Sequence, residues 1–170
     1  MVSLGGIVYS RSLKIGGDHM DQALVRHLED EHGITVGLRS ANQLKEAIGT
    51  AVPGQRGASV TVRGRDLQTG FPRAVEVNGS DVAAALQEPV GMIVDAVMAS
   101  MEHTPPDLLA DIHETGIVLA GGGAQLDGMD RVLGMATGMA TVVAEAPQCA
   151  SVRGAADLLL DAAMLREAAC

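Results

Sequence analysis

The feature that most limits how this chain can fold is an apolar run that ends in three consecutive glycines. Residues 117–120 are Ile, Val, Leu and Ala, and glycines 121–123 follow directly. The apolar residues of 126–133 then recur at helical spacing, so the order is that of a strand, a tight turn and a helix. A further strand over 141–144 and a helix over about 149–166 are expected next. Alternating strands and helices predict an α/β fold.

The first third of the chain predicts a short hairpin and two helices. A Gly5-Gly6 turn precedes residues 7–15, whose β-rich composition predicts a strand. Apolar residues repeat every four positions over about 18–32, which predicts a helix. Ser40 is expected to cap a second, shorter helix through its hydroxyl.

The middle of the chain predicts a small hairpin followed by a helix. Residues 57–78 contain two alternating apolar and polar runs, separated by a loop from Gly64 to Gly70. Ser80 is expected to cap the next helix. Pro89 is expected to break that helix and to start another, because proline lacks the helical donor and disfavours helical geometry at the residue before it.

The strongest local sign of a ligand site is the glycine turn at 121–123. Glycines let a ligand approach the backbone, and the start of the following helix offers free N–H groups. The same triplet also fits a purely structural tight turn, because it is neither a Walker loop nor a dinucleotide fingerprint. Gly16-Gly17-Asp18 likewise fits a sharp helix entry that Asp18 caps, and on spacing alone Lys45 and Glu46 fit a solvated helix face.

Composition excludes several classes of partner. The formal charge is −9, which repels nucleic acid and anionic membrane surfaces. No stretch is expected to reach the roughly 18 to 20 apolar residues that span a bilayer, and no leader segment is expected, so a cytoplasmic protein is predicted. Tyr9 and Phe71 are the only aromatic residues, so the core is expected to be aliphatic.

No residue pattern supports a metal centre or a catalytic triad. The two cysteines, Cys149 and Cys170, lack the spacing of a zinc site and are expected to be reduced thiols. The five histidines are scattered, without a metalloprotease spacing. A nucleophile elbow is also missing from the sequence. Taken bottom-up, the residues indicate an α/β domain with a glycine-turn ligand site and no catalytic or metal-ligating set.

Six segments, taken in order, resemble the MreB family of bacterial actins. They are SLGGIVYSRSLKIGGDHMDQAL (3–24), ANQLKEAIGTAVPG (41–54), VRGRDLQTGFPR (62–73), ALQEPVGMIVDAVMASME (85–102), ETGIVLAGGGAQLDGMDRVL (114–133) and VVAEAPQCASVRGA (142–155). The RGRDL and ALQEP segments are more specific than any glycine motif. The resemblance covers nearly the whole chain, but it matches the second lobe of the family only.

The resemblance implies the second lobe of the actin-like ATPase fold. Its larger, ribonuclease-H-like subdomain would comprise residues 1–36 and 104–166 and would be incomplete at its N-terminal strands. A smaller α+β subdomain, residues 37–103, would be inserted into it, and 167–170 would form a tail. Central strands are buried on both faces, so omitting them predicts a marginally stable, association-prone chain unless another chain supplies them.

The resemblance also implies a set of nucleotide-binding residues. The family's GGGA turn, which contacts adenosine and ribose, corresponds to Gly121, Gly122, Gly123 and Ala124. Its GGD turn beside the nucleotide corresponds to Gly16, Gly17 and Asp18. A family helix with the pattern AERxKxxIG keeps its lysine here as Lys45, whereas Asn42 replaces its glutamate. An amide can still hydrogen-bond a ribose hydroxyl, so weakened ATP binding is expected.

The phosphate loops and the catalytic acid of the family lie upstream of the segments matched here. Phosphoryl transfer needs groups that position and neutralise the phosphates and their magnesium, so ATP hydrolysis by this chain alone is not expected. The family's membrane-contacting elements also belong to the other lobe.

The function implied by the resemblance is that of a cytoskeletal, cell-shape-determining actin, present here as one half. Its expected partners are copies of itself or full-length MreB-like subunits in a filament, with cell-wall elongation proteins beyond them. Three alternatives stay open: a half-actin that caps filaments, an organelle- or plasmid-aligning relative, and a diverged kinase or chaperone-type ATPase. The RGRDL and ALQEP segments disfavour the last of these.

Overall fold

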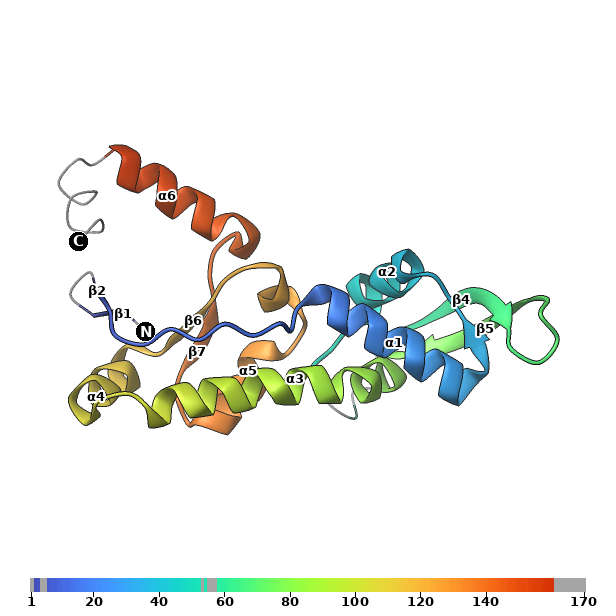
Figure 1. Ribbon diagram of the computed structural model, residues 1–170, viewed down its shortest axis with the longest axis horizontal. Coiled ribbons are helices and arrows are strands. Elements are labelled where there is room, and N and C mark those ends of the chain that lie inside the picture. Colours follow the sequence, from blue (N-terminus) through green and yellow to red (C-terminus); the bar gives the residue numbers. More distant parts are fainter. Residues whose placement is uncertain (1, 4–5, 53, 55–57, 161–170) are drawn as a thin grey trace.

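The computed structural model describes residues 2–3, 6–52, 54 and 58–160. The molecule is elongated (Figure 1), with a three-stranded antiparallel sheet near one end and a two-stranded parallel sheet toward the other. A short pair, β1 (Val2–Ser3) with β2 (Gly6–Ile7), lies near the N-terminus. The described residues thus form a mixed α/β structure, as the alternation of strands and helices predicted.

The three-stranded sheet has the order β3-β4-β5 and carries the predicted hairpin. Its strands are β3 (Ile34–Thr35), β4 (Ser59–Asp66) and β5 (Pro72–Asn78). Val62 lies opposite Val75, and Val60 opposite Val77, so the apolar residues of the two long strands share one face. The hairpin loop is shorter than predicted: Gly64 lies within β4, and the strands extend to Asp66 and from Pro72.

Three helices pack around this sheet and enclose the core. They are α1 (Gly17–His32), α2 (Leu38–Ile48) and α3 (Gly79–Glu102), and their most buried residues include Leu24, Leu28 and Leu86. The buried hydrophobic side chains of the described residues are all aliphatic or Met. This confirms the expected aliphatic core. The boundary between subdomains at residues 36 and 37 stays a prediction; α1 packs mainly on α2, α3 and β3.

Helix α3 corrects two predictions. It continues through Pro89 without a break, because Leu86 and Val90 on either side are buried in the core and hold both halves in place. Its N-cap is Asn78 rather than Ser80: the Asn78 side chain accepts from the backbone N–H of Ser80 and Asp81, and the Asp81 carboxylate accepts from Asn78 N–H. Ser80 fails as the cap because it already lies inside the helix.

Helix α3 is also long and apolar enough to cross a bilayer, by length and composition alone. This differs from the prediction that no stretch of the chain is long and apolar enough to span a bilayer. Eight residues of α3 are buried, and the helix packs on α1 and α5. A core helix passes the same hydropathy test, so the finding is weak evidence for a membrane span.

The other end contains the apolar strand and the glycine turn at 121–123. Its elements are α4 (Pro106–Thr115), β6 (Ile117–Leu119), the 3₁₀ turn η1 (Gly122–Gln125), α5 (Met129–Thr137), β7 (Thr141–Val143), the 3₁₀ turn η2 (Pro147–Cys149) and α6 (Ala150–Leu160). Strands β6 and β7 pair in parallel, with Val118 opposite Val142. The predicted order of strand, turn and helix is present, but a 3₁₀ turn separates the glycines from α5.

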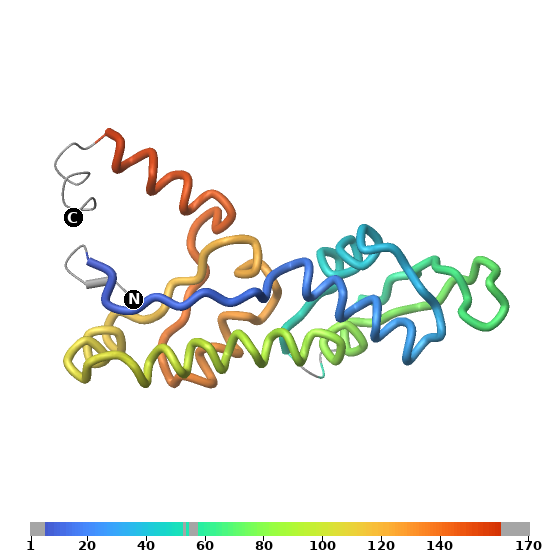
Figure 2. The backbone as a smooth tube through the Cα atoms, viewed as in Figure 1, coloured from blue at the N-terminus to red at the C-terminus, as the bar shows by residue number. Residues whose placement is uncertain are grey.

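The predicted strand over 7–15 is wrong beyond Ile7. The chain runs extended from β2 to α1 (Figure 2), and residues 8–16 belong to no sheet within the described part. A β-rich sequence becomes a strand only where a neighbouring strand accepts its hydrogen bonds. Here Tyr9 instead stacks on His103, with ring centroids 5.4 Å apart. Gly5, the tail 167–170 and the predicted helix beyond Leu160 lie outside the described residues.

Candidate functional site

A pocket of about 850 Å³ lies where α1 begins, α2 passes and the glycine turn ends. We call it the main pocket. Five of the nine predicted binding residues line it, and they come from three separate segments: Gly17, Asn42, Lys45, Gly122 and Gly123. Its remaining lining residues are Met20, Glu46, Ala47, Gly49, Gln125, Leu126, Asp127 and Gln148. The fold therefore gathers the glycine turns and the short helix around one cavity.

The glycine turn presents bare backbone to the main pocket. Gly121 has φ of 86°, which favours glycine, and its N–H donates to the Pro147 carbonyl over 2.7 Å. A Cβ added at Gly122 or Gly123 would meet no heavy atom within 4 Å. Ala124, by contrast, is buried and lies outside the pocket lining. The open positions are thus Gly122 and Gly123, where a ligand can reach the main chain.

The Gly16-Gly17-Asp18 turn begins α1, but not through the predicted cap. Gly16 is the N-cap, and its carbonyl accepts from the N–H groups of His19 and Met20. Asp18 makes no capping hydrogen bond, because it lies within the first turn of the helix instead of before it. Only Gly17 of the three lines the main pocket. Asp18 still places a negative charge at the positive end of the helix.

Lys45 is nearly buried and ties α2 to α1. Its Nζ donates to Asp21 Oδ1 over 2.7 Å and to the Gly17 carbonyl over 3.1 Å. The side chains of Lys45 and Asp21 are 13% and 9% exposed. The alternative reading of Lys45 as a solvated residue is therefore wrong. Its ammonium is held at the pocket wall by a carboxylate that neutralises it.

Sequence reasoning missed Asp21, although a signal was present. Asp21 occupies the same helical face as the buried Leu24 and Leu28, three and seven residues further on. A carboxylate on an apolar face must find a partner or lose its charge. That requirement predicts a basic residue from a neighbouring element, and α2 supplies it as Lys45.

The rim of the main pocket on α2 is formed by an amide and a carboxylate. Asn42 Nδ2 donates to Glu46 Oε1 over 2.9 Å, one helical turn away. Both side chains line the pocket, so Asn42 is available there as an uncharged hydrogen-bonding group. Ser40 does not cap this helix; the N-cap is Gly37, three residues earlier. The helix starts sooner than predicted: Leu38 and Arg39 already adopt helical geometry, so Ser40 lies inside the helix.

The opposite side of the pocket contains residues that no sequence signal singled out. Gln148 Nε2 donates to Gln125 Oε1 over 2.5 Å, which joins η2 to η1. Asp127 lies next to them and pairs with Arg131 over 3.6 Å, with both side chains more than half exposed. Gln125 and Gln148 are 23 positions apart, and only the tertiary structure brings them together.

The charges of the side chains that line the main pocket favour an uncharged ligand group. The lining side chains that carry charge are Lys45, Glu46 and Asp127, and Asp21 already neutralises Lys45. Amides from Asn42 and the two glutamines, bare glycine backbone and the apolar Met20 and Leu126 make up much of the remainder. Within the described residues no group of three or more metal-ligating side chains occurs. The arrangement suits a flat, polar-edged molecule such as a nucleoside, and does not fit a triphosphate with its magnesium.

Comparison with known proteins gives a consistent result. Residues 1–167 match the family model of the MreB/Mbl protein. The cell shape-determining protein MreB of Escherichia coli K12 is 44% identical over 154 residues, which are 91% of this chain and 44% of that protein. The cell shape-determining protein Mbl of Bacillus subtilis is 38% identical over 147 residues, 86% of this chain and 44% of that protein. The chain thus spans less than half the length of these relatives.

Solved structures agree on the fold. MreB5 of Spiroplasma citri bound to AMPPNP superposes with a TM-score of 0.88 at 29% identity, over 92% of this chain and 47% of that one. A MamK double helical filament matches with a TM-score of 0.73 at 20% identity, over 92% and 49%. These matches confirm that the described structure is part of the actin-like fold.

Proposed function

The chain belongs to the MreB/Mbl family, and from this premise we propose that it is a cytoplasmic, actin-like cytoskeletal chain whose main pocket forms one wall of an adenine-nucleotide site. In this proposal the wall binds the adenosine part of ATP, and the chain associates with copies of itself or with full-length MreB-like subunits. The observation that carries the proposal is the meeting of open Gly122 and Gly123 with Asn42 and Lys45 around one cavity.

Two findings on relatives support nucleotide binding. The structures of Spiroplasma citri MreB5 were solved with AMPPNP and with ADP. The match with AMPPNP-bound MreB5 covers 92% of this chain at a TM-score of 0.88. In this chain the backbone N–H groups of the glycine turn and the Asn42 amide would bind the base and ribose, while Met20 and Leu126 offer apolar contact. ATP brings phosphates that this wall does not neutralise, so no hydrolytic step is assigned to these residues.

Lys45 has a defined part in this proposal. Its ammonium is paired with Asp21 and also donates to Gly17, so it fixes the distance between the first turn of α1 and α2. Both elements contribute residues to the pocket lining, Gly17 and Met20 from α1 and Asn42 and Glu46 among others from α2. Lys45 thereby sets the width of the cavity, and it keeps one donor proton available for a ligand oxygen.

The test compares adenosine with ATP. We expect adenosine to bind with at least the affinity of ATP in the absence of magnesium, because Glu46 and Asp127 repel the phosphates. Titration of the ¹⁵N-labelled chain should shift the amide signals of Gly122, Gly123 and Asn42. Gly122→Val fills open space in the pocket and should weaken adenosine binding about tenfold or more. Gly154→Val, at an equally open position on α6, is the matched control. Failure of both ligands to bind would refute the nucleotide proposal.

The cytoskeletal part of the proposal has a separate test. Structural neighbours of the chain include MamK filaments, and its MreB and Mbl relatives are named cell shape-determining proteins, so the chain is expected to act in filaments that determine cell shape. The purified chain should pellet together with filaments of a full-length MreB relative. A chain that incorporates leaves the amount of polymer unchanged, whereas a capping half-actin lowers it at substoichiometric ratio. A chain that stays in the supernatant without changing the polymer would contradict both.

A further inference from the structure

The tip of the β4–β5 hairpin carries an aromatic side chain with no role in the core. Phe71, the single phenylalanine of the chain, is 74% exposed, and Leu67 in the same loop is 49% exposed. The loop lies at one end of the elongated molecule (Figure 1), and none of its residues lines the main pocket. We call residues 67–71 the hairpin tip. Aromatic side chains exposed in this way are frequent anchors of protein interfaces.

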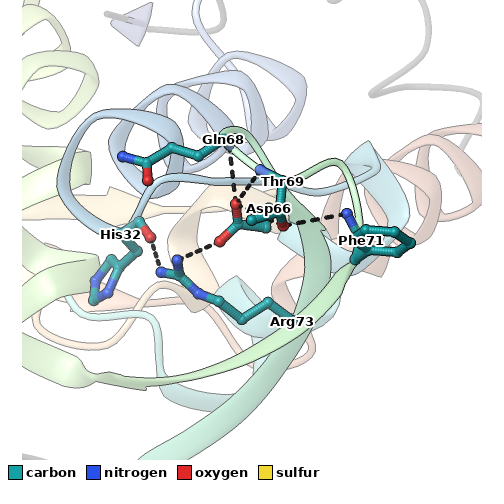
Figure 3. Close-up of polar contacts among 6 residues, drawn as sticks. All are labelled: His32, Asp66, Gln68, Thr69, Phe71 and Arg73. Carbon is teal, nitrogen blue, oxygen red and sulfur yellow. Dashed lines mark hydrogen bonds and ion pairs between the residues drawn. The ribbon is translucent and has the colours of Figure 1, made fainter.

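The hairpin tip is held in one shape by Asp66. Its Oδ1 accepts from the N–H groups of Gln68 and Thr69 over 2.9 and 2.8 Å, and its Oδ2 accepts from Arg73 over 2.5 Å (Figure 3). Arg73 also donates to the carbonyl of His32, which anchors the tip to the end of α1. These hydrogen bonds, above all that from Thr69 N–H, lower the pKa of Asp66 to about 2. The tip therefore loses little conformational entropy when it binds.

The surroundings of the tip are basic, in contrast to the chain as a whole. Arg63 and Arg65 alternate on β4 with the buried Val62 and Asp66, so both arginines lie on the outer face of the hairpin, where they are exposed. The complete chain has a formal charge of −9. A basic, apolar tip on an acidic protein is complementary in charge to other surfaces of the same protein.

The chain also contains an apolar groove between α3 and α5. It has a volume of about 220 Å³ and shares no residue with the main pocket; its lining is Ala51, Ala83, Gln87, Val90, Gly91, Val94, Asp95 and Val132. The small residues Ala51, Ala83 and Gly91 leave the space, and a Cβ added at Gly91 would meet nothing within 4 Å. The exposed Asp95 contributes a carboxylate to this lining. An apolar cavity of about 150 Å³ is enough to bind a benzene ring.

We propose that the hairpin tip of one copy inserts Phe71 into the α3–α5 groove of a second copy, with Arg65 or Arg63 facing Asp95. The ring fits the apolar groove in size and chemistry, and the charges beside it are opposite. Tip and groove are different surfaces, so the contact is heterologous and leaves a free tip and a free groove at the ends of each assembly. The proposal rests on the proposed self-association for the identity of its occupant, but not on nucleotide binding.

The experiment measures self-association of the complete chain without nucleotide, by sedimentation velocity over a range of concentrations. Phe71→Ser removes the anchor, and Gly91→Leu fills the groove from a position where a side chain has room. Each should raise the dissociation constant about tenfold or more. Met135→Ser, at an 87% exposed site on α5, is the matched control and should leave it unchanged. Circular dichroism verifies that all variants keep the fold.

A double variant that combines Phe71→Ser with Gly91→Leu distinguishes the proposed contact from non-specific association. Because Phe71 and Gly91 act in the same contact, the double variant should associate no more weakly than either single one. A wild-type chain that stays monomeric overturns the proposal, as does equal weakening by Met135→Ser. Loss of association in Phe71→Ser but not in Gly91→Leu also overturns it, because the groove is then not the receptor. Adenosine binding should be the same in all these variants, so the two proposals fail independently.

Discussion

The two ends of this molecule differ in how completely they bury their apolar residues. Around the three-stranded sheet, Leu24, Leu28 and Leu86 are at most 1% exposed. Around the parallel pair β6–β7, Val118 is 64% exposed, and α4 and α6 contain no buried residue among those described. In Figure 1, α6 stands away from the rest of the chain. The end with the three-stranded sheet buries its apolar side chains within its own core. The end with β6 and β7 exposes apolar surface that another structural element would normally cover.

This contrast agrees with the length comparison. The chain matches less than half of the relatives named above, and the open strands β6 and β7 pair only with each other among the described residues. A two-stranded sheet is marginal on its own, because much of its hydrogen-bonding edge and one face stay in water. The expected marginal stability of the isolated chain therefore concerns the end that contains β6, β7 and α6.

The largest expected effect tests the contrast directly. Leu86→Ala removes a fully buried side chain from the first end and should lower the free energy of unfolding by about 2–5 kcal/mol. Leu160→Ala, at a side chain that is 87% exposed on α6, should change it by less than about 0.5 kcal/mol. Urea unfolding followed by circular dichroism measures both. Equal effects at the two positions would mean that α6 is packed in solution and that the contrast is wrong.

A smaller effect is expected from the ion pair beside the main pocket. Asp21→Ala leaves the ammonium of Lys45 nearly buried without its carboxylate and should cost about 2 kcal/mol of unfolding free energy. The double variant Asp21→Ala, Lys45→Met removes both charges and should recover much of that loss. Thermal unfolding of the two variants and of wild type measures the coupling. If the single variant is as stable as wild type, Lys45 finds another partner and the pair does not hold α1 to α2.

The smallest effect is expected at the hairpin tip, on acidification. The pKa of Asp66 is about 2 in the folded chain and 3.8 otherwise, so its stabilising contribution is complete above 3.8 and is lost as the pH falls toward 2. Lowering the pH from about 7 to about 5 should leave the amide signals of Gln68 and Thr69 unchanged. Asp66→Asn should perturb both signals already at neutral pH. A titration of these signals near pH 5 in wild type would show that the tip is less ordered than described.

The sequence anticipated the local elements where one pattern decides the structure. The period of Met20, Leu24 and Leu28 predicted α1, and the alternation of Val60 and Val62 predicted the hairpin. The prediction of helix caps failed where another residue a few positions away takes that role. Asn78 caps α3 in place of Ser80, and Gly37 caps α2 in place of Ser40. A cap depends on where the helix starts, and the two starts lie two and three residues before the predicted ones.

The tertiary structure alone decided which candidate residues share a site. Gly17, Asn42 and Gly122 lie on three separate segments of the chain. No local sequence pattern predicts how far apart these segments lie in space. The same holds for the pairing of Asp21 with Lys45, 24 positions apart, and for the continuous α3 through Pro89. In both cases burial in a common core outweighs the local preference.

The sequence by itself determined the order of elements, the aliphatic core and the family resemblance, because these depend on residue types and spacing. Long-range packing determined the cavity, its charge and the surfaces left open, because those depend on which segments meet in space.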